Sequence, residues 1–316
     1  MACSIKTISE IEGLFKRFSI YKENLIYLKG LHCSNINRLI SKVDPYSKWI
    51  PASNILEDKK NIVGIGAVLF EKKGRFFLAP YRFSSLFKYS KGEFIELFAI
   101  NGWVVRGKSY KQVVERLRGP KSSLVLITFK LRKGLKSIYV VRESYERPAV
   151  EFIHLGDKAF FRIFHFSSRE VTNFIKDKLE GFNFRKVILD LRPCPGGDLF
   201  EALDLASLFL APKKRLVFLE DSKGKRQLIT VPTTLPTFKH SIQVMVSSYT
   251  ASAAEVFAGV MKYYNRAKIS GEKTVGKCVS QGEYHLSDGS ILRISNLKIY
   301  FPDMSTCQGK GISPNN

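Results

Sequence analysis

The sequence predicts a mixed fold of the α+β or α/β class, with an N-terminal helical extension (residues 1–60), a strand-rich domain (61–145) and a layered α/β core (146–316). Three patterns support this division. Apolar residues recur at helical spacing in the first part, short β-rich runs alternate with glycine turns in the second, and strands alternate with helices in the third. With 316 residues, 45% of them hydrophobic, the chain has the composition of a globular protein with more than one folding unit.

The extension is predicted to be helical because its apolar side chains repeat every three or four residues. These residues are Ile11, Leu14, Phe15 and Phe18, followed by Leu25, Leu28 and Leu31. The turn-rich segment VDPYSKWIPASN follows them and is expected to end the extension.

Two hairpins are predicted in the strand-rich domain, turning at residues 72–74 and at residues 133–134. Between them, SYKQVVERLRG predicts a helix with Ser109 as its N-cap and Gly119 as its stop. After Pro148 the apolar strands KVILDL and SIQVMVSS each lead through a short turn into a helix, which predicts a layered core.

Charge and hydropathy narrow the functional classes. Lys and Arg outnumber Asp and Glu by 51 to 28, a formal net charge of +23, which favours contact with anions. The basic residues are spread from Lys6 to Lys310 without a nucleic-acid-binding motif, so we expect no specific nucleic acid partner and keep a basic nucleic-acid-binding protein only as an alternative. No segment reaches the roughly 18 apolar residues of a membrane span, and the N-terminus lacks the apolar region of a secretory signal, so a soluble chain is expected.

The cysteines are scattered and odd in number, without a CxxC pair or a Cys/His cluster. We therefore expect lone buried thiols, with neither a disulfide framework nor a zinc site, and no metal or organic cofactor. The five residues are Cys3, Cys33, Cys194, Cys278 and Cys307.

Three segments carry candidate chemistry. In MVSSYTASAAEVFAGVM a strand leads through small residues into a helix that begins at Ser252, where a serine alone would be read as an N-cap. In GEKTVGKCVSQ, Lys277 precedes Gln281 by 4 residues, and alternate residues of a strand face the same side, so both are expected to reach one site. Burial would lower the pKa of Lys277 toward that of a base, whereas a lone lysine in so basic a chain is normally a surface residue.

The third segment, VILDLRPCPGGDLF, is an apolar strand that ends in a glycine turn at Gly196 and Gly197. Glycine permits the close approach of a substrate, and backbone N–H groups at such a turn can stabilise an oxyanion. Many strand-to-helix turns can contain PGG, so this motif alone does not identify an active site.

Together the three segments resemble the carboxyl-terminal processing, or tail-specific, serine proteases, whose motifs DLRxNPGG, GSASASE and GExTFGKGxVQ recur in this order. The 25 residues from Ser252 to Lys277 and the 4 from Lys277 to Gln281 match the Ser/Lys/Gln arrangement of that family. The resemblance implies an endopeptidase in which Ser252 is the nucleophile, Lys277 the general base and Gln281 the residue that orients it.

The same resemblance implies that the N–H groups of Ala253 and of Gly196 or Gly197 bind the oxyanion. It also implies a fold in which a PDZ-like domain is inserted ahead of a core similar to the crotonase and Clp-protease superfamily. The backbone of Gly64–Gly66, with Ile65 between the two glycines, would receive a substrate's C-terminal carboxylate. The implied partners are proteins or peptides with free C-termini, and the implied location is outside the cytoplasm, in the periplasm or cell envelope.

Three departures from the family pattern lie near this chemistry: Tyr249 replaces a glycine, Ala254 a serine and Cys194 an asparagine. None of them removes a proposed catalytic side chain. Cys194 suggests a thiol protease, but no histidine has a supporting motif. A catalytically silent protein that binds peptides through the PDZ-like domain remains the main alternative.

Overall fold

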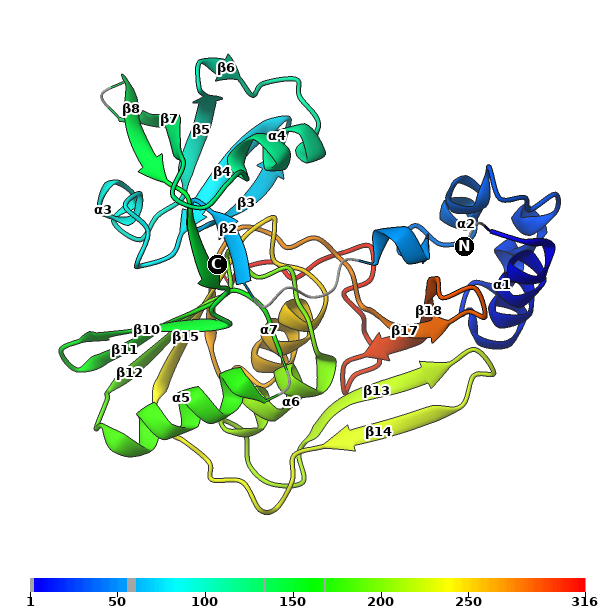
Figure 1. Cartoon of the computed structure of the whole chain (residues 1–316). Coiled ribbons are helices and arrows are strands. Elements are labelled where there is room, and N and C mark those ends of the chain that lie inside the picture. Colours follow the sequence, from blue (N-terminus) through cyan, green and yellow to red (C-terminus); the bar gives the residue numbers. More distant parts are fainter. Residues whose placement is uncertain (1–2, 56–60, 133, 168, 316) are drawn as a thin grey trace. The chain divides into compact units, whose positions relative to one another are not determined.

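The structure, a computed structural model, describes residues 3–55, 61–132, 134–167 and 169–315 (Figure 1). The chain forms a mixed α+β fold of two units. The first unit comprises Met1–Glu57, His154–Phe161 and His165–Asn316, and the second comprises Asp58–Ile153 and Arg162–Phe164. The N-terminal extension therefore belongs to the same unit as most of the C-terminal core.

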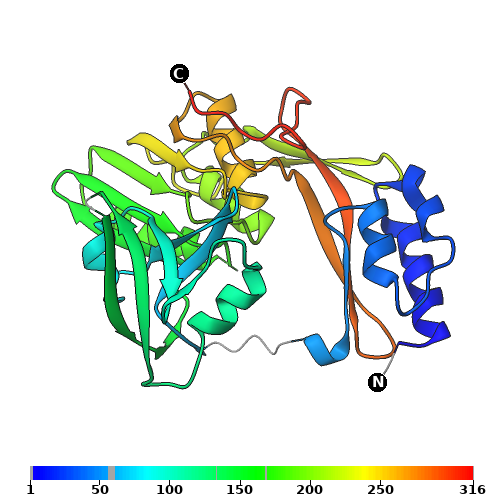
Figure 2. The same cartoon turned by 90° about the horizontal axis from the view of Figure 1, so that it is seen from above.

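Helices form the N-terminal part of unit 1, in agreement with the apolar spacing. They are α1 (Ile5–Phe18), the 3-10 helix η1 (Lys22–Leu28), α2 (Ile36–Val43) and the short 3-10 helix η2 (Ala52–Asn54). Ser4 caps α1, because its hydroxyl accepts the N–H of Thr7 at 3.2 Å. The apolar faces of α1 and α2 pack with Leu292 and Ile294 of β18, beside the β17–β18 hairpin (Figure 2).

In the described part of the chain, the strands of unit 1 belong to two five-stranded sheets. One has the order β10-β11-β12-β15-β16, and its strands are β10 (Val150–Leu155), β11 (Lys158–Ile163), β12 (Lys186–Asp190), β15 (Ser241–Val246) and β16 (Lys268–Gly271). The other has the order β1-β18-β13-β14, with β17 paired to β18. Its strands are β1 (Lys48–Ile50), β13 (Arg215–Asp221), β14 (Arg226–Thr230), β17 (Val279–His285) and β18 (Ile291–Tyr300).

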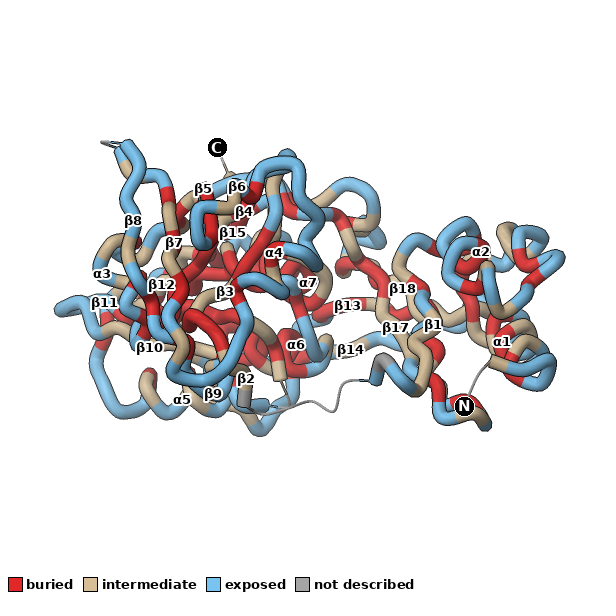
Figure 3. Tube along the Cα trace, turned by 45° about the horizontal axis from the view of Figure 1, so that its top comes forward, coloured by how far each residue is buried: buried red, intermediate tan, exposed pale blue. Residues whose placement is uncertain are grey.

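The pairing of β12 with β15 positions the candidate site. These strands are parallel, with Asp190 opposite Met245, so both chains leave the sheet at the same edge. Each strand then leads into a helix, α6 (Leu199–Ser207) or α7 (Ala253–Tyr263), and α5 (Glu170–Gly181) precedes β12. Figure 3 shows that buried residues concentrate in these strands and helices.

Unit 2 holds a sheet in the order β3-β4-β5-β7-β8, with β6 paired to β5, and a separate pair of β2 with β9. The strands are β2 (Asn61–Gly64), β3 (Ala67–Lys72), β4 (Arg75–Pro80), β5 (Ile95–Ile100), β6 (Trp103–Val104), β7 (Leu124–Leu131), β8 (Gly134–Val141) and β9 (Glu143–Glu146). The helices are α3 (Phe87–Ser90) and α4 (Tyr110–Leu117), and Ser109 caps α4 as predicted. Lys133, in the predicted second turn, lies outside the described residues.

The prediction for the cysteines is wrong for four of them. Cys3 is bonded to Cys33 and Cys278 to Cys307, with Cα atoms 5.7 and 5.4 Å apart. The partners are 30 and 29 residues apart in the sequence, so no local pattern reveals them and only the fold brings them together. Cys194 is a free, buried thiol, as predicted.

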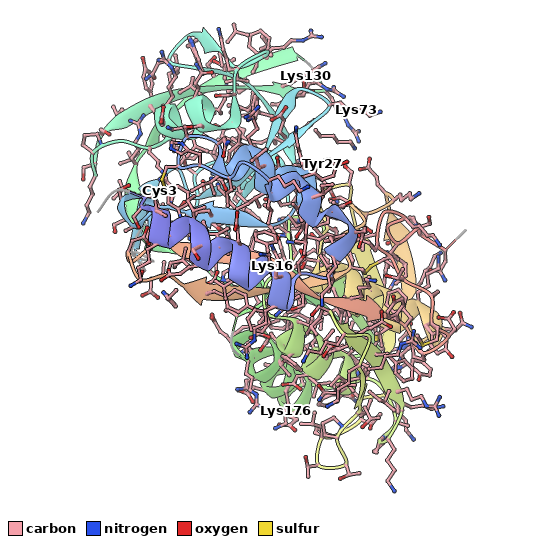
Figure 4. All side chains as sticks on the ribbon, turned by 90° about the vertical axis from the view of Figure 1, so that its right-hand side faces the viewer. Cys3, Lys16, Tyr27, Lys73, Lys130 and Lys176 are labelled. Carbon is pink, nitrogen blue, oxygen red and sulfur yellow. A yellow bond between two sulfur atoms is a disulfide. The ribbon has the colours of Figure 1, made fainter. Side chains whose placement is uncertain are left out.

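The described residues contain no cluster of three or more His, Cys, Asp or Glu side chains suited to a metal ion. Within the same part of the chain, no helix has the length and apolar character needed to cross a membrane. Basic side chains lie on many separate elements, as Figure 4 illustrates with Lys16 on α1, Lys73 between β3 and β4, Lys130 on β7 and Lys176 on α5. The positive charge is therefore distributed over both units.

Candidate active site

Ser252 lies where the turn after β15 leads into α7. Its backbone dihedrals are φ 55° and ψ −126°, a conformation that non-glycine residues rarely adopt. Such a conformation costs about 1–3 kcal/mol and persists only where the surroundings enforce it. A serine on a strained strand-to-helix turn is the arrangement of a nucleophile elbow, whereas an ordinary N-cap residue has an extended backbone. The backbone therefore separates Ser252 from a simple helix cap.

Hydrogen bonds to the segment after β12 hold this turn. The Thr250 hydroxyl accepts the N–H of Ser247 at 2.9 Å and donates to the Leu191 carbonyl at 2.8 Å. The Ser247 hydroxyl donates to the Arg192 carbonyl at 2.7 Å. Arg192 is itself fixed by two hydrogen bonds from its guanidinium to the buried Asp190 carboxylate, at 2.8 and 3.1 Å. The two turns at the sheet edge thus form one hydrogen-bonded structure.

Gly196 packs directly against the turn that carries Ser252. Its φ is 108°, and a Cβ atom at this position would lie 2.8 Å from both Ser252 Cβ and the Ala251 carbonyl oxygen. The same Cβ would lie 3.1 Å from the Ala253 nitrogen. No side chain larger than hydrogen fits here without displacing Ser252.

Of the two glycines proposed for the oxyanion turn, Gly196 is the one beside Ser252. Gly197 forms a bridge with Phe166, and a Cβ on Gly197 would collide with the Phe166 backbone. The N–H groups of Gly196 and Ala253 donate to no backbone or side-chain acceptor among the described residues. These two groups are consequently the better candidates for binding an oxyanion.

Glu255, three residues after Ser252, connects the turn that carries Ser252 to the lysine segment, residues 274–277. Its fully buried carboxylate accepts, through Oε2, the backbone N–H of Ser252 at 3.0 Å and that of Lys277 at 2.7 Å. Through Oε1 it accepts the N–H of Gly276 at 2.6 Å and the hydroxyl of Thr274. One oxygen atom thus fixes the backbones of both Ser252 and Lys277.

Lys277 lies two residues before the start of β17 and is half-buried. Its Nζ donates to Gln281 Oε1 at 2.7 Å, and Gln281 Nε2 donates to the Tyr46 carbonyl at 2.7 Å. The Tyr46 ring lies beside the amine, with Nζ 5.3 Å from the ring centroid. The structure therefore brings Lys277 and Gln281 together, and it adds Tyr46 from the N-terminal extension.

Burial lowers the pKa of Lys277, because the protein removes water from the ammonium form. The charge of Arg293 acts in the same direction. The carboxylates of Asp44 and Glu255 oppose it, since each stabilises the ammonium ion. Desolvation is the largest of these effects, so Lys277 loses its proton and becomes a neutral amine more easily than a surface lysine does.

The three departures from the family pattern leave the turn intact. Ala254 is fully buried at the start of α7, and the Tyr249 N–H donates to the Ser247 hydroxyl at 3.1 Å. Cys194 is also fully buried, and burial raises the pKa of its thiol to about 12. Because the thiolate is the nucleophilic form of cysteine, this environment argues against a thiol protease.

The residues proposed to bind peptides, Gly64, Ile65 and Gly66, lie in unit 2 and connect β2 to β3. The Ile65 carbonyl accepts the Ser84 hydroxyl at 2.8 Å, and the Gly66 carbonyl accepts the Tyr81 N–H at 2.9 Å. The Gly66 backbone also hydrogen-bonds the phenol of Tyr145. A carboxylate that binds at Gly66 therefore has to compete with this phenol.

Comparison with known proteins identifies the family of the chain. The family model for Peptidase family S41 matches residues 157–316, and the chain belongs to this family. It is 33% identical over 281 residues to a probable CtpA-like serine protease of Staphylococcus epidermidis, and 31% identical over 280 residues to one of Staphylococcus aureus. These matches cover 86% of this chain but only 57% and 56% of the relatives, so the chain spans little more than half their length.

Among solved structures, the fold is similar to that of a photosystem II D1 C-terminal processing protease. The TM-score is 0.66 at 20% identity, and the match covers 98% of this chain and 91% of that one. At this identity the likeness establishes the fold alone. It supports a mixed α+β architecture along nearly the whole chain.

Sequence reasoning did not single out Glu255 or Tyr46 as parts of the site. Glu255 follows Ser252 in an S-x-x-E pattern, the signature of a capping box, and that pattern was the available signal. Tyr46 lies in the turn-rich segment VDPYSKWIPASN, and its residue type gave no signal, because its contact with Gln281 uses the main-chain carbonyl.

Proposed function

We propose that the chain is a serine-type endopeptidase with Ser252 as nucleophile, Lys277 as general base and Gln281 as the residue that orients the base. The shared hydrogen bonds of Glu255 Oε2 carry this proposal, because they hold Ser252 and Lys277 to one atom although 25 residues separate them. The desolvated position of Lys277 supports its role as a base.

In the proposed mechanism, the neutral amine of Lys277 takes the hydroxyl proton as Ser252 Oγ attacks the scissile carbonyl carbon. The oxyanion that forms is bound by the N–H groups of Gly196 and Ala253, each worth roughly 3 kcal/mol to the transition state. The Lys277 ammonium then donates its proton to the leaving amine, which departs and leaves an acyl-enzyme on Ser252. Lys277 next takes a proton from the water that attacks the ester carbonyl, and it returns this proton to Ser252 Oγ as the second product leaves.

Kinetics of Ser252→Ala and Lys277→Ala test this mechanism directly. On an internally quenched peptide, each change should lower kcat by roughly a thousandfold or more, and the double variant should be little worse than either single one. Gln281→Ala should cost less, since Gln281 transfers no proton. An active Lys277→Ala enzyme, or losses that add in the double variant, would contradict the proposed pair.

For substrate recognition, we propose that residues 61–145 act as a PDZ-like domain ahead of a crotonase-like and Clp-protease-like core, and that this domain binds free C-termini. Strand β3 supports this, because it lies at the end of its sheet and has β4 as its neighbour on one side. Helix α4 borders β3, since the Tyr110 hydroxyl donates to the Leu69 carbonyl at 3.1 Å. Residues 61–145 also contain 17 Lys and Arg against 5 Glu, which favours a carboxylate ligand.

The test is a pair of peptides that differ only at the C-terminus, one a free acid and the other an amide. Because binding far from the scissile bond is the same in the ground and transition states, the acid should have the lower KM at similar kcat. Equal kcat/KM for the two peptides would refute C-terminal recognition without affecting Ser252 and Lys277.

We further propose that the protein works outside the cytoplasm, in the cell envelope or periplasm. The Cys3–Cys33 and Cys278–Cys307 disulfides support this, because such bonds persist in oxidising compartments. If thiol exchange is quenched in intact cells with acid and the protein is then labelled with a maleimide under denaturing conditions, which expose the buried Cys194, one of the five cysteines should react before reduction and all five after it. Full labelling before reduction would contradict the location.

A further inference from the structure

We propose that the turn Asp44–Ser47, which belongs to the N-terminal extension, is a positioning element for the general base and acts through the amide of Gln281. The inference rests on the proposed function, since it assigns a role to residues around Lys277. It predicts that part of the catalytic geometry is set more than 200 residues upstream in the sequence, because 235 residues separate Tyr46 from Gln281.

The orientation of the Gln281 amide is the central observation. An amide has two unlike ends, and only its oxygen can accept a hydrogen bond from the lysine. The Tyr46 carbonyl is purely an acceptor and lies 2.7 Å from Gln281 Nε2, so Oε1 must face Lys277 Nζ, which lies 2.7 Å away. A reversed amide would point N–H groups at the lone pair with which the amine takes the serine proton. Tyr46 therefore selects the productive orientation.

A buried carboxylate fixes the position of the Tyr46 carbonyl. Asp44 is fully buried and ends α2, and its N–H donates to the Ile40 carbonyl at 2.9 Å. Its Oδ1 accepts the Tyr46 N–H at 2.9 Å, while Oδ2 accepts the Ser47 hydroxyl and the Ser295 N–H. Ser295 on β18 lies opposite Gln281 on β17 in the strand register. Asp44 thus joins the turn to the strand pair that carries Gln281.

The other side of the turn is tied to the segment that follows Lys277. The Tyr46 hydroxyl accepts a hydrogen bond from Gln308 Nε2 at 3.2 Å, and Gln308 Oε1 accepts the N–H of Cys278 at 2.8 Å. The disulfide from Cys278 to Cys307 closes this small ring of contacts. The turn is therefore held from two directions, through its carbonyl and through the tyrosine ring.

Asp44 also has an electrostatic effect that a purely structural residue would lack. Four influences act on the pKa of Lys277: burial and Arg293 lower it, whereas Asp44 and Glu255 raise it. Removing the Asp44 charge therefore lowers the pKa of Lys277 further. Since the neutral amine is the active form, activity should rise with pH as Lys277 loses its proton. This rise, the basic limb of the pH profile, should move to lower pH.

The test compares Asp44→Asn with Asp288→Asn. Asp288 is a matched control, because its carboxylate also holds a turn, through the Ser290 N–H at 2.9 Å, and bonds a helix, through the Thr7 hydroxyl at 2.8 Å. With an internally quenched peptide, Asp44→Asn should lower kcat about tenfold at nearly constant KM and shift the basic limb to lower pH. Asp288→Asn should leave both unchanged.

A double-variant cycle establishes that Asp44 acts through Gln281. If it does, adding Asp44→Asn to Gln281→Ala should lower kcat by less than about twofold beyond Gln281→Ala alone. Additive losses, or an Asp44→Asn enzyme indistinguishable from Asp288→Asn, would overturn the inference. If Asp44→Asn shows no cooperative unfolding transition and is therefore not folded, Ser47→Ala replaces it. Ser47→Ala should lower kcat several-fold, and an unchanged kcat would refute the role of the turn. An active Lys277→Ala enzyme would instead refute the proposed function, so the two failures are distinguishable.

Discussion

Replacing Glu255 by glutamine perturbs the site with almost no change of shape. Each carboxylate oxygen accepts two hydrogen bonds, Oε2 from the N–H groups of Ser252 and Lys277, and Oε1 from Gly276 and Thr274. Glutamine keeps one accepting oxygen and places an NH2 group where the other was. In the better orientation the NH2 group faces Thr274, whose hydroxyl can turn and accept, and the N–H of Gly276, which loses its acceptor.

The expected loss of stability follows from this count. One buried N–H without an acceptor costs about 1–3 kcal/mol, and loss of the charge weakens the remaining hydrogen bonds, so we expect about 2–4 kcal/mol in total. The melting temperature should fall by about 3–6 °C. Because Gly276 adjoins Lys277, movement of the lysine segment should also lower kcat by about 10- to 100-fold at nearly constant KM.

Thermal unfolding and peptide cleavage measured on the same samples check both effects. Glu201→Gln is the matched control, because Glu201 is also buried and accepts a backbone N–H, that of Thr172 at 2.7 Å, but lies on α6 away from the lysine segment. Its kcat should equal that of the wild type. If Glu255→Gln were less stable but fully active, the proposed coupling of Ser252 and Lys277 through Glu255 would be refuted.

Three further predictions concern the base, the oxyanion turn and the peptide-binding loop. Activity should rise with pH as Lys277 loses its proton, with an apparent pKa below the usual value of about 10.4 because burial disfavours the ammonium ion; a profile without this limb would exclude Lys277 as base. Gly196→Ala should lower kcat at least about 100-fold. Gly224→Ala is the control, because Gly224 has φ 79° and open space around it, and this change should lower stability without lowering kcat. Equal activity of the two variants would remove Gly196 from the oxyanion site. Tyr145→Phe should lower KM for a peptide acid but not for its amide, since the phenol no longer occupies the loop backbone, and an unchanged KM for the acid would argue against that competition.

The sequence was most informative where chemistry demands particular side chains in a fixed order. The motifs containing Ser252, Lys277 and Gln281 could be located by spacing, and the structure brings Lys277 and Gln281 to 2.7 Å. The alternation of strands and helices likewise predicted the mixed α+β class, because period-2 and period-3.6 patterns reflect burial along each element. The division of the chain into three domains at residues 60 and 145 stays a prediction.

What the sequence could not reveal depends on contacts between distant segments. Gly196 and Gly197 are equivalent as letters, and only the direction of each backbone places Gly196 against Ser252. The Tyr46 contact uses a main-chain carbonyl that every residue possesses, so no residue type marks it. The pairing of the cysteines could not be predicted either, since a spacing of about 30 residues is compatible with many folds.

Covalent labelling of the nucleophile tests the central claim most directly. Treating the protein with a fluorophosphonate and mapping the adduct by mass spectrometry should give one modified residue, Ser252, because an activated serine attacks phosphorus with loss of fluoride. Lys277→Ala should label at least about a hundredfold more slowly, while Asp288→Asn should label at the wild-type rate. An adduct on another residue, or unchanged labelling of Ser252 in Lys277→Ala, would contradict the assignment of Ser252 and Lys277 as nucleophile and base.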